Sequence, residues 1–102
     1  MAIKNFKNDA TADVFNGVNS KKARKVVSEK ATGAARKRLD ALASAGTIED
    51  LKKAGHPVMD LKHTMPGFYR IKVNDQYRVL FRLEDGQFAD VEIADYHGEQ
   101  TS

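Results

Sequence analysis

Residues 69–83 read YRIKVNDQYRVLFRL, and the fold class can be inferred outward from this segment. Apolar side chains occupy every second position on both sides of a polar triplet, residues 74–76. A period of two is typical of a half-buried β-strand, whose side chains point to opposite faces in turn. The stretch therefore predicts a β-hairpin with one apolar face and one face rich in Arg and Lys.

The register of this hairpin follows from the same alternation. A two-residue loop over residues 74–75 would place Ile71 opposite Arg78 and mix apolar with charged side chains. A three-residue loop over residues 74–76 places Ile71 opposite Val79 instead, and opposed residues share a face. We adopt the second register because it gathers the apolar side chains on one face.

Alternation continues on both sides of the hairpin, in residues 58–63 before it and in residues 89–93 after a turn at Asp85-Gly86. In the candidate strand 58–63, we expect Met59 and Leu61 to be buried. The register expected for the last two strands pairs Leu83 with Ala89, Phe81 with Val91 and Val79 with Ile93.

The N-terminal half changes to helical spacing. After a possible short strand over residues 3–6 and a short helix over 9–15, residues 20–45 form the main helical region. This region is one bent helix or two, because Thr32-Gly33 is a weak point. Ser20 can cap its start and Gly46 its end. The buried stripe is expected to contain Val27, Ala31, Ala34, Ala35, Leu39 and Leu42.

A further helical turn or two is expected over residues 47–53. The fold class is therefore α+β, with N-terminal helices packed on a three- to four-stranded, mostly antiparallel sheet. At 102 residues the chain is one domain, residues 1–102.

Composition excludes several classes of protein. The chain has no Cys, so disulfides and thiolate zinc sites are ruled out. No apolar run reaches the roughly 18 residues that span a bilayer, and the N-terminus lacks the apolar stretch of a signal peptide. We expect a cytoplasmic protein that contacts no membrane, binds no metal and needs no cofactor.

The charged face of the sheet contains the candidate site. Lys62 is expected to turn to this face together with Arg78 and Tyr96, so that the three converge at one end of the sheet. Arg82 is expected to form an ion pair with Asp90. The candidate face carries Arg70, Lys72, Arg78, Arg82, Asp90, Glu92 and Tyr96.

Two cations and a phenol suit the cleavage of RNA, whose own 2′-OH can attack the adjacent phosphorus without a metal. Arg78 can stabilise the charge on the phosphorane oxygens, and Lys62 can neutralise charge or take part in proton transfer. Tyr96 can stack on a base or exchange a proton. A solvated surface, a packing tyrosine and a loose terminal His97 are the structural alternatives, so an enzyme and a plain nucleic-acid-binding module both stay open.

A second group of cations lies on the helices. These residues are either a solvated helix face or contacts to the phosphate backbone of a large RNA. The candidate RNA-binding residues are Lys21, Lys22, Arg24, Lys25, Arg36 and Lys37 on the helices, with Arg70 and Lys72 on the sheet.

Four segments together resemble the HigB toxins of the RelE superfamily, which are bacterial type II toxins. They are residues 15–17 (FNG), 35–40 (ARKRLD), 70–79 (RIKVNDQYRV) and 91–97 (VEIADYH). The resemblance implies a ribosome-dependent, metal-independent endoribonuclease that cuts mRNA in the ribosomal A site. It also implies a helix-turn-helix, HigA-like antitoxin as partner.

The resemblance assigns catalytic roles to Lys62, Arg78 and Tyr96, with Asp95 and His97 flanking the tyrosine. The sequence departs from the family pattern at Met59, where many HigB toxins have a histidine. Two other functions stay open: a RelE-fold inhibitor of DNA gyrase, and a catalytically silent RNA- or protein-binding module.

Overall fold

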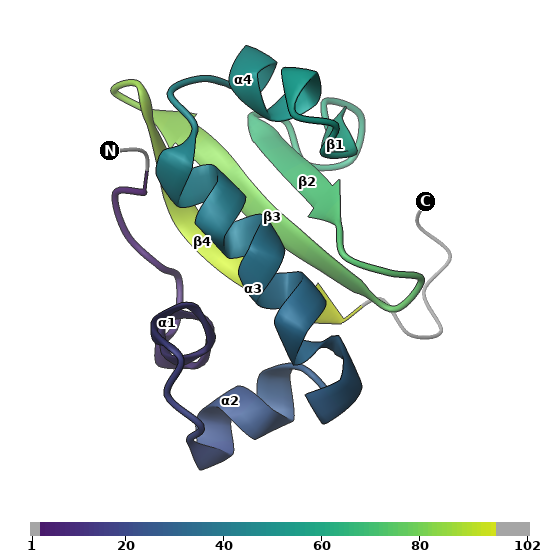
Figure 1. The fold of residues 1–102 in the computed structure, drawn as a ribbon. Coiled ribbons are helices and arrows are strands. Elements are labelled where there is room, and N and C mark those ends of the chain that lie inside the picture. The colour runs from purple at the N-terminus through teal and green to yellow at the C-terminus, as the bar shows by residue number, and fades with distance from the viewer. Residues whose placement is uncertain (1–2, 96–102) are drawn as a thin grey trace.

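The computed structural model describes residues 3–95. Within them lie the helices α1 (Asp9–Asn16), α2 (Lys21–Val26), α3 (Glu29–Ser44) and α4 (Ile48–Lys53). They are followed by the strands β1 (Val58–Asp60), β2 (Phe68–Lys72), β3 (Tyr77–Glu84) and β4 (Gln87–Asp95). The strands form one antiparallel sheet in the order β1-β2-β3-β4, and α3 crosses one of its faces (Figure 1). The expected α+β class is confirmed.

The central hairpin has the predicted register. Ile71 pairs with Val79, as the three-residue loop requires, and Val79 pairs in turn with Ile93. Asp85 and Gly86 form the next turn with φ values of 52° and 77°. Two successive positive φ values are typical of a type I′ turn, whose twist matches that of paired strands.

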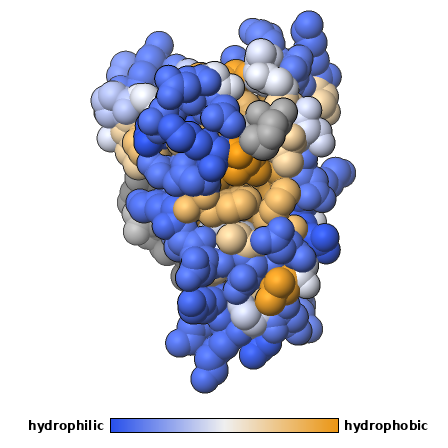
Figure 2. Space-filling view, turned by 90° about the vertical axis from the view of Figure 1, so that its left-hand side faces the viewer, coloured by the Kyte–Doolittle hydropathy of each residue, from blue (hydrophilic) through white to orange (hydrophobic). Residues whose placement is uncertain are grey.

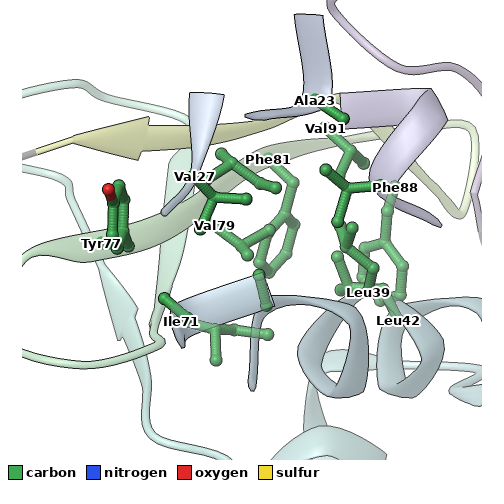
Figure 3. Packing of buried hydrophobic residues seen from close by; sticks show 14 of the residues in the cluster. Ala23, Val27, Leu39, Leu42, Ile71, Tyr77, Val79, Phe81, Phe88 and Val91 are labelled. Carbon is green, nitrogen blue, oxygen red and sulfur yellow. The ribbon is translucent and has the colours of Figure 1, made fainter. Parts of the chain in front are cut away.

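The core lies between this sheet and the helices. Phe81 and Phe88 meet edge to face with ring centroids 5.1 Å apart, and both are almost fully buried. Leu39 and Leu42 of α3 are fully buried in the same cluster (Figure 3). Ala34 is exposed, so it does not belong to the buried stripe as expected. No helix in residues 3–95 is both long and apolar enough to cross a membrane.

The helical region 20–45 is two helices, and the break is not at Thr32-Gly33. Val27 adopts an extended backbone and is 1% exposed, which ends α2. The backbone N–H of Ser28 donates to the Tyr77 hydroxyl at 3.0 Å. This contact with β3 satisfies a donor at the break, whereas Gly33 continues inside α3. Ser20 caps α2 as expected, by accepting from the backbone N–H of Ala23.

The expected register of β3 with β4 is wrong at its far end. Leu83 pairs with Phe88, not with Ala89, because the register shifts between Leu80 and Arg82. Asp90, in the opposing segment of β4, has a φ of 50°, as an irregular residue in a β-bulge can. An extra residue in one strand leaves the alternation on either side intact, so the sequence pattern did not show it.

Two segments that we expected to be strands are shorter in the structure. β1 ends at Asp60, and Lys62 and His63 lie in a turn. Residues 3–6 form two isolated parallel bridges to β4 rather than a strand. Met59 is 46% exposed and pairs with Arg70, so its expected burial is also wrong.

Thr11 connects α1 to the end of β4 and provides a test of this packing. Its hydroxyl oxygen is fully buried and accepts the backbone N–H of Ile93 at 3.1 Å. Thr11→Val keeps the shape but leaves that N–H without a partner. We expect a loss of about 1–3 kcal/mol in the free energy of unfolding, measured by urea denaturation. Thr64→Val, in an exposed turn, is the control; an equal loss there would contradict this role of Thr11.

His56 makes the stability of the chain depend on pH. Burial, followed by the positive charges of Arg38 and Lys37, lowers the pKa of His56 below 6.5. In the unfolded chain His56 takes up a proton below about pH 6.5, whereas in the folded chain it does so only at lower pH. The free energy of unfolding therefore falls as the pH drops from 7.5 to 5.5. We expect His56→Gln to reduce this fall in melting temperature. His63→Gln should leave it unchanged, and the reverse order would refute the assignment.

Candidate functional site

Three cations lie on the face of the sheet that is turned away from α3, here called the outer face. Arg70, Lys72 and Arg78 alternate with Ile71 and Val79, which belong to the core on the other side. Lys72 and Arg78 are directly paired across β2 and β3. Opposed residues share a face and lie close together, so this pair concentrates positive charge at one end of the hairpin.

The backbone of the hairpin loop positions Arg78. The side chain is 9% exposed, and its Nη1 donates to the backbone carbonyl oxygens of Asn74 and, at 3.0 Å, Tyr77. These bonds fix the guanidinium beside the loop. A fixed guanidinium is suited to bind a phosphate through two parallel N–H donors.

Asn74 gives the loop its shape. Its Oδ1 accepts the backbone N–H groups of Gln76 at 2.9 Å and Tyr77 at 2.8 Å, which closes a turn around the side chain. Sequence reasoning treated this residue only as part of a turn. Asn at the start of a short loop is the signal that could have identified it, because its side chain mimics a backbone turn.

The same loop reaches both of its neighbours. Asp75 forms an ion pair with Lys72 at 3.2 Å, and Gln76 Nε2 donates to Asp95 Oδ2 at 3.3 Å. Asp95 pairs with Tyr77 at the end of β4. The loop therefore contacts Lys72 and Asp95 and positions Arg78 at the same end of the sheet.

Arg70 occupies the middle of the outer face. It pairs with Met59 on one side and Leu80 on the other, and it is only 8% exposed. Its Nη1 is buried without a hydrogen-bond partner among residues 3–95. A buried, unpaired donor costs roughly 1–3 kcal/mol, and more on a charged group. A polar group kept at such a cost is typical of a functional site.

Arg82 differs from Arg70 because carboxylates neutralise it. Its Nε donates to Asp90 at 2.6 Å and its Nη2 to Glu84 at 2.8 Å, which confirms the expected ion pair with Asp90. The hydrogen bond to Asp90 raises the pKa of Arg82. Bonds from Asn5 and Arg82 lower the pKa of Asp90, and bonds from Lys4 and Arg82 lower that of Glu84. Arg82 is therefore part of a structural network.

Lys62 does not lie beside Arg78, so the expected convergence of these two residues is wrong. It lies in the turn beyond Leu61, whose backbone N–H bonds to Phe68 at the start of β2. Arg78 pairs with Lys72, at the other end of β2. Four residues along a strand correspond to about 13 Å. The cause is the early end of β1, which leaves Lys62 outside the sheet.

Tyr96 and His97 lie outside the described residues, so their positions in the site stay predictions. The helical cations Lys21, Lys22, Arg24, Lys25, Arg36 and Lys37 are exposed and lie on α2 and α3, the layer on the other side of the sheet. The expected RNA-binding residues therefore form two separate groups. Among residues 3–95, no three His, Asp or Glu side chains gather as a metal site would require.

Helices on one face of an antiparallel sheet and a basic outer face define a protein of the RelE-like fold class. The chain belongs to the HigB-like toxin family, because the family model for the RelE-like toxin of the type II toxin–antitoxin system HigB matches residues 4–97. A search of curated proteins gave no match. Family membership gives the chain the role of a toxin and implies an antitoxin as its partner.

Asn74 offers a test of how the loop holds Arg78. Asn74→Ala removes the acceptor for two backbone N–H groups, and we expect a loss of about 1 kcal/mol in unfolding free energy. The Arg78 side-chain N–H signals in NMR should also broaden or shift. Asn74→Asp keeps an acceptor oxygen and should stay close to the wild type. If both substitutions left the Arg78 signals unchanged, the loop would not position that side chain.

Proposed function

We propose that this chain is a ribosome-dependent endoribonuclease that cuts mRNA and so inhibits translation. The proposal rests on the buried Arg70, whose Nη1 has no hydrogen-bond partner among the described residues 3–95, on the same face as the loop-held Arg78. A phosphate on the outer face would supply the missing acceptor. Family membership supports a toxin role, and this face is where the chain could act on RNA.

The proposed reaction needs only the RNA and protein side chains. The 2′-oxygen bonds to the adjacent phosphorus as it loses its proton, and the bond from phosphorus to the 5′-oxygen breaks. The 5′-oxygen takes up a proton, which leaves a 2′,3′-cyclic phosphate and a 5′-hydroxyl end. Arg78 and Arg70 stabilise the negative charge on the phosphorane oxygens, and Lys72 neutralises the flanking phosphate.

Proton transfer is assigned to Tyr96, which follows Asp95 in the chain. Gln76 holds Asp95 at the loop that positions Arg78, so the chain leaves β4 beside the proposed phosphate site. Met59, opposite Arg70, has a thioether that cannot take part in proton transfer. In this proposal Lys62 contacts the RNA strand further along. The helical cations outside the hollow described below, Lys21, Lys22, Lys25 and Lys37, contact ribosomal RNA.

Purified protein added to ribosomes carrying mRNA tests this function. We expect cleaved mRNA with 5′-hydroxyl ends, and a rate at least about 100-fold lower for Arg78→Ala and for Arg70→Leu. Arg70→Leu should be no less stable than the wild type, because it removes a buried charge with an unpaired donor. Lys53→Ala, on an exposed position of α4, is the matched control.

Each alternative function predicts a different result. Ribosome binding with intact mRNA would indicate a silent binding module. Inhibition of DNA supercoiling by gyrase, with no cut RNA, would indicate a gyrase inhibitor. Wild-type cleavage by both arginine variants would refute the site while leaving the activity in place.

A further inference from the structure

The helical layer contains a hollow that is separate from the outer face and has no part in the proposed reaction. Its volume is about 220 Å³, the share of roughly seven water molecules in the liquid. Val14, Ala23 and Val27 line it and are buried, whereas Val18 lines it and is 49% exposed. The other lining residues are Gly17, Asn19, Arg24, Glu29, Thr32 and Arg36.

The hollow is formed before any partner arrives. Gly17 caps α1 with a φ of 76°, and the backbone N–H of Val18 donates to Asp13 at 2.8 Å. Ser20 joins α1 to α2. Its hydroxyl donates to Asp13 Oδ2 at 2.6 Å, and its Oγ accepts the backbone N–H of Ala23 at the start of α2. A recess that is already formed in the unbound chain lowers the ordering cost of binding.

Two arginines and one glutamate line the hollow. Arg24 and Arg36 are exposed lining residues, and the Arg36 guanidinium lies about 3.5 Å from where a side chain on Gly17 would begin. Residues 21–38 contain eight Lys and Arg and one carboxylate, Glu29. The region is therefore far more basic than the whole chain, whose net charge is +3. An acidic partner is favoured here.

The lining favours a protein segment over RNA. RNA bases bind proteins by stacking on aromatic rings, and none of the described residues that line the hollow is aromatic. A phosphate backbone needs cations but no apolar recess. An apolar side chain inserted into a recess and surrounded by charge pairs is the usual centre of a protein interface.

We propose that this hollow docks an acidic segment of the antitoxin, with one apolar side chain inserted beside Val18 and carboxylates paired with Arg24 and Arg36. We choose an antitoxin as the occupant because membership of the toxin family implies an antitoxin partner. Figure 2 shows the left-hand side of the Figure 1 view, where α1 lies; an apolar band crosses an otherwise hydrophilic surface there. The hollow and the outer face belong to different layers, so the antitoxin would neutralise the toxin without covering Arg78.

Substitutions of Val18 test the proposal. The probe is the protein encoded beside this chain, and its affinity for the purified toxin is measured by calorimetry. Val18→Glu fills the recess and repels carboxylates, so we expect at least tenfold weaker binding. Val18→Lys fills the recess but attracts carboxylates, so its loss should be smaller. Leu83→Glu is the matched control, because Leu83 is also apolar and 43% exposed but lies on β3.

A second readout separates this proposal from the proposed function. Val18→Glu alone should inhibit translation like the wild type, but should no longer be neutralised at wild-type antitoxin concentrations. Wild-type affinity of Val18→Glu, an equal loss in Leu83→Glu, or a neighbouring protein that fails to bind the wild type would overturn the proposal. So would Val18→Glu losing ribosome binding while keeping the antitoxin. Failure of the wild type to cut mRNA would refute the proposed function and leave the binding result standing.

If Val18→Glu does not fold, as judged by circular dichroism, Val18→Ala takes its place. Val18→Ala removes the two methyl groups of Val18 from the recess and adds no charge. We then expect about a threefold loss of affinity, and unchanged affinity would overturn the proposal.

Discussion

The antiparallel pairing of β2 with β3 determines which side chains face the helices and which face outward. Once Ile71 faces Val79, Tyr77 and Phe81 face the helices with them. Lys72 must then face Arg78 on the other side, where Leu80 lies opposite Arg70. One shift of a single residue would exchange the two faces. The core and the basic outer face are therefore two consequences of one register, and Asn74 stabilises the loop that sets it.

The outer face shows two ways of keeping an arginine on a sheet. Arg82 is neutralised by Asp90 and Glu84, and those contacts join β3, β4 and the N-terminal segment through Asn5 and Lys4. Arg70 has a buried donor that finds no partner in the part of the chain the structure describes, and it lies opposite apolar side chains. The first arrangement stabilises the fold. The second lowers stability, and we interpret it as the cost of a site prepared for an anion.

The two layers of the molecule present two different surfaces. The sheet offers fixed guanidinium groups beside a short loop, which suits a phosphate. The helices offer an apolar recess with cations at its edge, which suits a protein segment with acidic side chains. This separation would let the antitoxin bind the helical layer while the RNA substrate binds the outer face on the other side of the sheet.

Properties that depend on neighbours along the chain could be predicted from the amino-acid sequence. Alternation predicted the hairpin, its loop length, the pairing of Ile71 with Val79 and the sides on which Arg70 and Arg78 lie. Ser20 marked a helix start because capping uses the next few residues. Four features became visible only in the folded chain. Two are local irregularities: the helix break at Val27-Ser28 and the bulge opposite Phe81. The other two are the early end of β1, which separates Lys62 from Arg78, and the burial of Arg70. The physical reason is that each of these depends on contacts between segments far apart in sequence, such as the Tyr77 hydroxyl at Ser28. Such contacts leave no periodic pattern in the chain.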